Sequence, residues 1–77
     1  MTQAQTFARH LNGLAKAPGF GYAKARAAAR KEPAVDAAAT KAANAGFNPE
    51  VDGCESFVMR DGSICEWRAA SFSYVAR

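Results

Sequence analysis

Residues that carry chemistry are scarce in this sequence. Its 77 residues include two cysteines, one histidine and one tryptophan. No stretch approaches the roughly 20 consecutive apolar residues that span a bilayer, and residues 1–16 carry polar side chains throughout, unlike a secretion signal. We therefore expect a cytoplasmic protein without membrane contact. Thiols stay reduced in that compartment, so Cys54 and Cys65 are expected to be free rather than bridged.

The residue patterns of the common enzyme classes are also missing. Nothing in the sequence places His10 beside either cysteine with a carboxylate behind it, as nucleophilic catalysis requires. The two cysteines are too far apart for a Cys-x-x-Cys pair, and a tetrahedral zinc site would need two further ligands. Gly19-Phe20-Gly21 lacks the lysine and hydroxyl residues of a phosphate loop. We expect no catalytic residues, no metal and no cofactor.

The short chain limits the core that it can build. A chain of this length forms one domain, here residues 1–77, and buries only roughly 60% of the surface that its unfolded form exposes. Its hydrophobic fraction of 49% overstates the core, because alanine contributes much of it and each buried alanine removes little apolar area from water. Such a scaffold commonly gains stability from a disulfide, a metal or a partner chain.

Composition changes abruptly along the chain. Alanine-rich, weakly apolar sequence fills residues 1–46, whereas aromatic and β-branched residues follow Cys54 and surround one Asp61-Gly62 turn. This break predicts an α+β fold. About three helices within residues 2–46 are expected to pack on a small antiparallel sheet of two or three strands within residues 54–76.

Hydrophobic spacing places the three helices. Phe7, Leu11 and Leu14 predict the first over 2–15, with Thr2 as its N-cap. A second helix is expected over 22–31, with small side chains on one side and basic side chains on the other. A third is expected over 33–45, with Pro33 in its first turn and Gly46 after its end. The buried stripe predicted for this third helix consists of Val35, Ala38, Ala39 and Ala42.

The Asp61-Gly62 turn predicts a hairpin of residues 55–60 and 63–68. A two-residue loop would pair Val58 with Cys65 and would place Phe57 and Ile64 on one face, with Cys65 and Trp67 on the other. Both faces then carry apolar residues, so the face without helices could bind a partner or a second copy of the chain. Residues 71–75 follow as a third strand whose direction is open, because Ala69-Ala70 lacks a turn-forming glycine or asparagine.

Charge and aromatic residues suggest two binding surfaces. The net charge of +3 and the basic arc of the second helix favour an acidic partner, although a solvated helix face is the plain alternative. Aromatic and arginine side chains in the last quarter of the chain are typical of protein interfaces, with core packing as the alternative. The predicted binding surface comprises Lys24, Arg26, Arg30, Lys31, Arg60, Trp67, Arg68 and Tyr74.

The short chain, its alanine-rich helices and its hairpin segment Phe57-Val58-Met59-Arg60-Asp61-Gly62-Ser63 resemble small phage and mobile-element proteins, including the anti-CRISPR inhibitors. The resemblance implies a non-enzymatic inhibitor in the host cytosol that docks on a CRISPR surveillance complex and blocks nucleic-acid binding or nuclease recruitment. Many such inhibitors are acidic and imitate DNA. This chain is basic, which favours an acidic protein surface or the guide RNA backbone as its target. The alternative is a small nucleic-acid-binding or regulatory protein.

Overall fold

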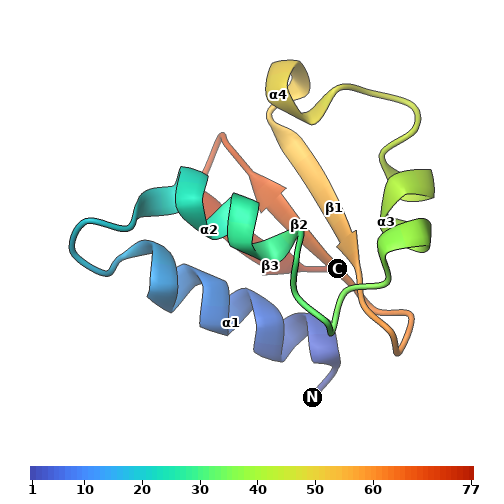
Figure 1. Ribbon diagram of the computed structural model, residues 1–77, viewed down its shortest axis with the longest axis horizontal. Coiled ribbons are helices and arrows are strands. Elements are labelled where there is room, and N and C mark those ends of the chain that lie inside the picture. Colours follow the sequence, from blue (N-terminus) through green and yellow to red (C-terminus); the bar gives the residue numbers. More distant parts are fainter.

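The computed structural model describes residues 1–77, apart from the side chain of Glu50. The elements in chain order are α1 (Gln3–Ala15), α2 (Gly21–Ala29), α3 (Ala37–Ala43), the single turn α4 (Pro49–Asp52), β1 (Cys54–Val58), β2 (Ile64–Arg68) and β3 (Ser73–Ala76). The strands form one antiparallel sheet in the order β1-β2-β3. Helices α1 and α2 cover one face of it, and α3 lies beside β1 (Figure 1). The predicted α+β architecture is confirmed.

The first turn of α1 is capped by its own residues and by the β1–β2 hairpin. Gln5 N donates to Thr2 Oγ1 at 3.1 Å, and Thr2 N donates to Gln5 Oε1 at 2.8 Å, which makes the predicted N-cap part of a capping box. The tip of the hairpin supplies the other acceptors. Gln3 N donates to Asp61 Oδ2 at 3.0 Å, and Ala4 N donates to Ser63 Oγ at 2.9 Å. The turn therefore anchors the helix as well as joining two strands.

The hairpin loop contains three residues rather than the predicted two. Met59 N donates to Ser63 O at 2.8 Å, and Gly62 N donates to Met59 O at 2.9 Å. Gly62 has a φ of 87°, the left-handed conformation that follows a type I turn in such loops. The predicted pairing of Val58 with Cys65 is therefore wrong by one residue, and Val58 pairs with Ile64 instead.

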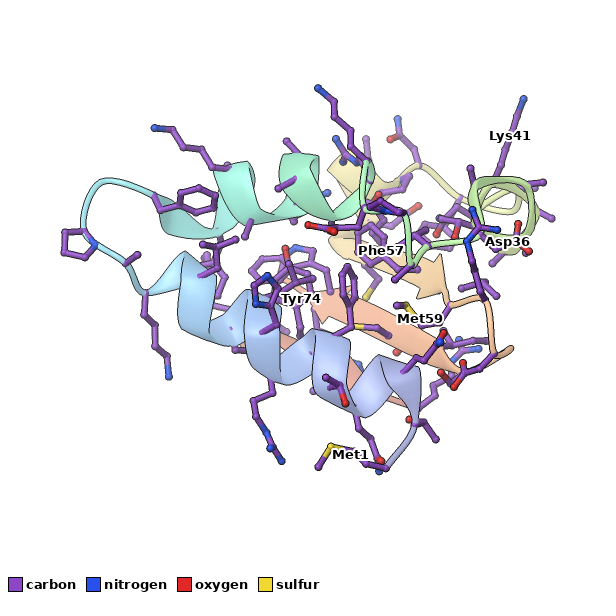
Figure 2. All side chains as sticks on the ribbon, turned by 60° about the horizontal axis from the view of Figure 1, so that its bottom comes forward. Met1, Asp36, Lys41, Phe57, Met59 and Tyr74 are labelled. Atoms are coloured by element: carbon purple, nitrogen blue, oxygen red, sulfur yellow. The ribbon has the colours of Figure 1, made fainter. Side chains whose placement is uncertain are left out.

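This one-residue shift exchanges the two faces of β2, because side chains alternate along a strand. Cys65 pairs with Phe57, and both lie in the core beneath the helices. Phe57 contacts Phe7 of α1, with ring centroids 6.5 Å apart. Figure 2 shows Phe57, Met59 and Tyr74 between the helices and the sheet. By alternation, the other face of the sheet carries Cys54, Ser56, Val58, Ile64, Glu66, Arg68, Ser73 and Val75.

Helix α3 is shorter than predicted and buries none of its residues. Its N-cap is Asp36, whose side chain accepts a hydrogen bond from Ala39 N. Val35 lies outside the helix and is buried where it forms a bridge with Met59. Ala38 and Ala42 are exposed and Ala39 is half-buried, so the predicted buried stripe is wrong for its three alanines, and only Val35 is buried as predicted. The alanine spacing predicted a buried helix face, but α3 packs against the edge of the sheet rather than against its face.

Polar side chains of α3 and of the residue that caps it complete the outer edge of β1. Val58 N donates to Thr40 Oγ1 at 2.9 Å. Asn44 makes two bonds to one strand residue, since Ser56 N donates to its Oδ1 and its Nδ2 donates to Ser56 O, both at 2.9 Å. At the opposite edge, Asn12 of α1 pairs in the same way with Tyr74 N and O of β3. Both edges are thus blocked against further strand pairing.

The β2–β3 connection reverses the chain without a glycine. Phe72 N donates to Ala69 O at 3.2 Å, and Arg68 pairs with Ser73. Phe72 takes the left-handed position of this loop, with a φ of 47°. The direction of the third strand, which the sequence left open, is therefore antiparallel. Within the described residues, no helix combines the length and apolar character needed to cross a membrane.

Candidate binding surface

The basic arc predicted for the second helix is divided by one buried carboxylate. Arg30 donates from Nε to Glu55 Oε2 and from Nη2 to Oε1, both at 2.8 Å, while Arg26 Nη2 donates to Oε1 at 3.1 Å. Glu55 is only 5% exposed on the helix-facing side of β1. Arg26 and Arg30 therefore tie α2 to the sheet, and we name these three residues the Glu55 cluster.

Opposing effects act on the Glu55 carboxyl group. Burial raises its pKa, but the hydrogen bonds and charges of Arg30 and Arg26 outweigh burial and hold the pKa below its ordinary value of 4.5. Glu55 is therefore ionised at neutral pH. Both guanidinium groups bond to this one carboxylate, and the cluster thereby joins α2 to β1 through charge.

The remaining cations of the arc are both exposed: Lys24 lies on α2, and Lys31 lies two residues beyond its end. They belong to a segment whose charged residues all have the same sign. Residues 1–31, which form α1 and α2, contain six lysine or arginine residues and no acidic residue, whereas all seven acidic residues lie between 32 and 77. All charged residues of the α1–α2 layer are therefore basic, although most of its residues carry no charge.

Trp67 and Tyr74 are core residues, and their prediction as binding-surface residues is corrected. They are 3% and 2% exposed, with ring centroids 5.1 Å apart beneath the helices. The one-residue shift in the hairpin register turned Trp67 to the helix-facing side. The same burial raises the pKa of the Tyr74 hydroxyl.

One aromatic side chain beside Trp67 remains outside the core. Phe72 is 63% exposed, and its ring centroid lies 6.0 Å from that of Trp67 and 5.9 Å from that of Tyr22 at the start of α2. Tyr22 lies 5.1 Å from Trp67, and the Arg26 guanidinium lies 5.7 Å from the Trp67 ring centre. We name Tyr22, Trp67 and Phe72 the aromatic platform. The sequence favoured Phe72 for the core, and no local signal marked it as exposed.

The two other predicted arginines make local contacts. Arg68 Nη2 lies 3.0 Å from Glu66 Oε2, and Arg77 Nη2 lies 2.5 Å from Glu66 Oε1, on the face of the sheet away from α1 and α2. Arg60 is exposed at the hairpin and donates from Nε to Pro33 O at 2.6 Å. The structure therefore distributes the predicted arginines over three places instead of the two expected surfaces.

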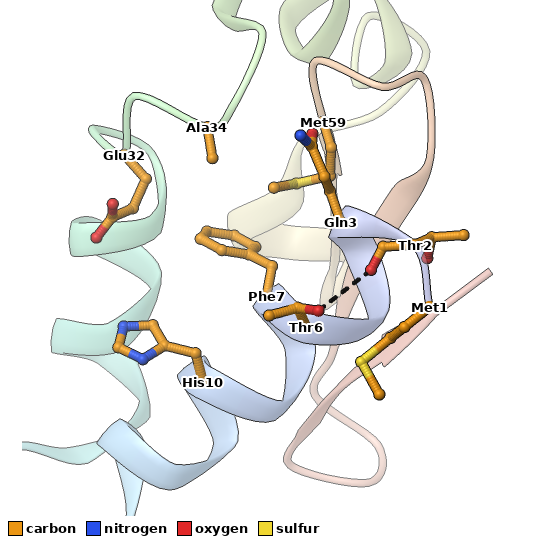
Figure 3. A pocket seen from close by; sticks show the side chains of 9 residues that line it. All are labelled: Met1, Thr2, Gln3, Thr6, Phe7, His10, Glu32, Ala34 and Met59. Carbon is orange, nitrogen blue, oxygen red and sulfur yellow. Dashed lines mark hydrogen bonds between the residues drawn. The ribbon is translucent and has the colours of Figure 1, made fainter.

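A cavity of about 350 Å³ lies between the N-terminal half of α1 and the segment after α2. Phe7 and Met59 are among its apolar lining residues, and Thr6, His10 and Glu32 are among its polar lining residues (Figure 3). His10 and Glu32 lie along the same wall, opposite Met59. The single histidine is thus on the exposed side of α1.

The cysteines lie apart from this cavity lining. Both are free; Cys54 is exposed and Cys65 is buried. Burial raises the pKa of the Cys65 thiol to about 12, with a smaller contribution from the charge of Glu66, so this thiol is not a nucleophile at neutral pH. Among the side chains that the structure describes, no three His, Cys, Asp or Glu residues are grouped as metal ligands.

Comparison with known proteins gave no match to this chain among protein-family models, curated proteins or solved structures.

Proposed function

We propose that this protein is a non-enzymatic binding protein of the phage-inhibitor type, which docks its α1–α2 layer on an acidic part of a bacterial nucleoprotein defence complex. The observation that carries the proposal is the charge of that layer. Its residues include six cations and no acidic side chain, and clustered cations of this kind steer a protein toward an acidic surface. Docking there would obstruct nucleic-acid binding or nuclease recruitment by the complex.

The arrangement of the acidic residues supports this orientation. Glu55 and Glu66 each hold two arginine side chains. Asp36 caps α3, and Asp61 caps α1. These four carboxylates are engaged within the fold and do not neutralise the exposed Lys24 and Lys31. A partner with excess negative charge would supply that neutralisation.

A second candidate, a nucleic-acid-binding or regulatory protein, is favoured by one observation. The sequence shows no aromatic residue on the basic arc, but the fold brings the exposed Phe72 against Tyr22 of α2. Exposed aromatic rings beside cations are typical of sites that bind single-stranded nucleic acid. The target class can therefore include the nucleic acid of such a complex.

Affinity capture from a bacterial lysate tests the leading proposal. We expect the tagged chain to retain a stoichiometric set of subunits after nuclease treatment. Lys24→Glu with Lys31→Glu should reduce the capture at least tenfold, because each reversal places a like charge against the partner. Lys41→Glu is the matched control, since it changes an exposed lysine on α3, where Figure 2 shows Lys41 pointing away from the fold.

Retention of the subunits by the Lys24 and Lys31 variant would contradict docking through the α1–α2 layer. Nucleic acid as the sole captured component would favour the second candidate instead. Circular dichroism of each variant ensures that reduced capture does not reflect unfolding, because neither lysine contributes to the buried core.

A further inference from the structure

Phe72 occupies a backbone position that glycine would fill at lower energy. The β1–β2 loop has Gly62 at its left-handed position, with a φ of 87°, whereas the β2–β3 loop has Phe72 there, with a φ of 47°. Left-handed conformation is uncommon for a bulky residue, and such strain is concentrated at functional sites. Its side chain is also 63% exposed. Burial of the ring therefore does not explain its presence.

We propose that the aromatic platform stacks an unpaired base of single-stranded nucleic acid, with Phe72 as the residue that contacts the base. The inference rests on the basic α1–α2 layer of the proposed function, and it deepens the second candidate by naming the residues that would hold the nucleic acid. Tyr22 and Trp67 support the Phe72 ring from two sides.

Ring geometry leaves Phe72 accessible to a flat ligand. Its plane makes angles of 68° with Tyr22 and 79° with Trp67, so neither neighbour is stacked in parallel on it. Trp67 is buried beside the Phe72 ring and supports it from the core. Every nucleobase has a π-face, and a base can therefore stack on Phe72 whatever its sequence.

Cationic side chains belong to the elements that meet at the platform. The Arg26 guanidinium of α2 lies 5.7 Å from the Trp67 ring centre on the helix-facing side. Arg68 is the last residue of β2, before the loop that contains Phe72, and its side chain pairs with Glu66 on the opposite face of the sheet. Residues 1–31, which include Tyr22, contain six cations and no acidic residue. A strand stacked on Phe72 would carry its phosphates along this basic layer.

The exposed apolar area of the platform is small. Among the described residues, three large apolar side chains are exposed, namely Met1, Val51 and Phe72. Of these, Phe72 is the one that contacts α2 through Tyr22. A stable protein interface buries about 800 Å² per partner around an apolar centre, whereas one exposed ring suffices to stack a base. Duplex DNA keeps its bases inside the helix, so the platform selects single strands.

Fluorescence anisotropy with labelled oligothymidylate and oligouridylate tests the inference. We expect the wild-type chain to bind these single strands more tightly than a duplex of the same length, with an affinity that falls as salt rises. Phe72→Gly should weaken single-strand binding about tenfold, since it removes the stacked ring. Phe72→Tyr should retain most of the affinity. Val51→Ala is the control for loss of an exposed apolar side chain.

Equal affinity of wild type and Phe72→Gly for the single strands would overturn the inference, as would equal binding of single strand and duplex. A thermal melt of each variant accompanies the assay. If Phe72→Gly does not fold, Phe72→Leu replaces it, because leucine keeps the apolar bulk without a π-face, and the same tenfold loss is expected.

A polyglutamate peptide separates this inference from the proposed function. Tight binding of polyglutamate that is unaffected by Phe72→Gly, together with no binding of single strands, would overturn the stacking site and leave docking on an acidic protein surface intact. Loss of both ligands in the Lys24 and Lys31 variant, with Phe72 unchanged, would show that the α1–α2 layer provides the charge that both modes require.

Discussion

Glu55 joins two layers of the fold through charge rather than through apolar contact. Its carboxylate is nearly covered, and it accepts hydrogen bonds from Arg26 and Arg30 of α2. Small residues such as Ala25 and Ala29 fill the rest of the buried face of that helix. Because alanine buries little apolar area, the Glu55 cluster fixes the position of α2 where side-chain packing is thin.

Replacement of Glu55 by glutamine should destabilise the fold by about 1–3 kcal/mol at neutral pH. The loss is smaller than for a fully buried ion pair, because Arg30 is 43% exposed and water screens part of the interaction. The folded pKa of Glu55 lies below 4.5. The stabilisation is therefore complete above pH 4.5 and is lost as the pH falls through the folded pKa. Urea melts of wild type and Glu55→Gln at several pH values measure this difference.

The difference between the two chains should narrow as the pH falls below 4.5. Glu32→Gln is the control, because Glu32 lines the cavity near α1 and belongs to neither arginine pair. A constant difference between wild type and Glu55→Gln over the acid range would contradict the assignment of the ion pair as the source of the stabilisation.

At the scale of elements, the sheet edges are completed by side chains instead of strands. Thr40 and Asn44 lie one helical turn apart and reach Val58 and Ser56, which lie two residues apart on β1. Two polar side chains on one helix face thereby match two outward-facing residues of a strand. This match explains how α3 stays in place although it buries none of its residues.

Asn44→Ala should destabilise the protein by about 1–3 kcal/mol, because Ser56 is buried and both of its backbone groups lose their partner. Hydrogen exchange should accelerate at the Ser56 amide more than at amides within the β1–β2 ladder. Lys41→Ala on the exposed side of α3 is the matched control. Unchanged exchange at Ser56 in Asn44→Ala would show that the helix does not protect this edge through its side chain.

The hairpin illustrates the limit of prediction at this scale. Aspartate and glycine correctly indicated a turn between two strands, but a two-residue and a three-residue loop both accommodate this pair. The choice depended on contacts from outside the hairpin. Asp61 and Ser63 cap the first turn of α1, and the observed register places Cys65 and Trp67 in the core. Neither interaction is local in sequence.

At the scale of the whole molecule, the two faces of the sheet differ in chemistry. The helix-facing side carries Phe57, Trp67 and Tyr74 in the core. The other side has Glu66 in its middle strand, bound to Arg68 and Arg77, with half-buried Val58, Ile64 and Val75 around it. A charged network at the centre of a face opposes its burial against a second copy, because desolvation of the ion pairs is costly.

We therefore predict a monomer in solution, although the sequence left a homodimer through this face open. Light scattering at micromolar concentration should give the mass of one chain, 8.2 kDa. A dimer mass for the wild-type chain, together with a monomer mass for Ile64→Glu, would contradict this prediction and assign the dimer contact to that face.

The sequence by itself determined the order and type of the three longer helices and of the three strands, but not the single turn α4. Capping residues, hydrophobic spacing and turn residues are local signals, and they placed α1, α2, the hairpin and the third strand. Tertiary structure decided which side chains meet. It set the register of β2, turned Trp67 and Tyr74 inward, paired Arg26 and Arg30 with Glu55, and left Phe72 exposed beside α2. These outcomes depend on contacts between distant segments, and a shift of one residue reverses the faces of a strand.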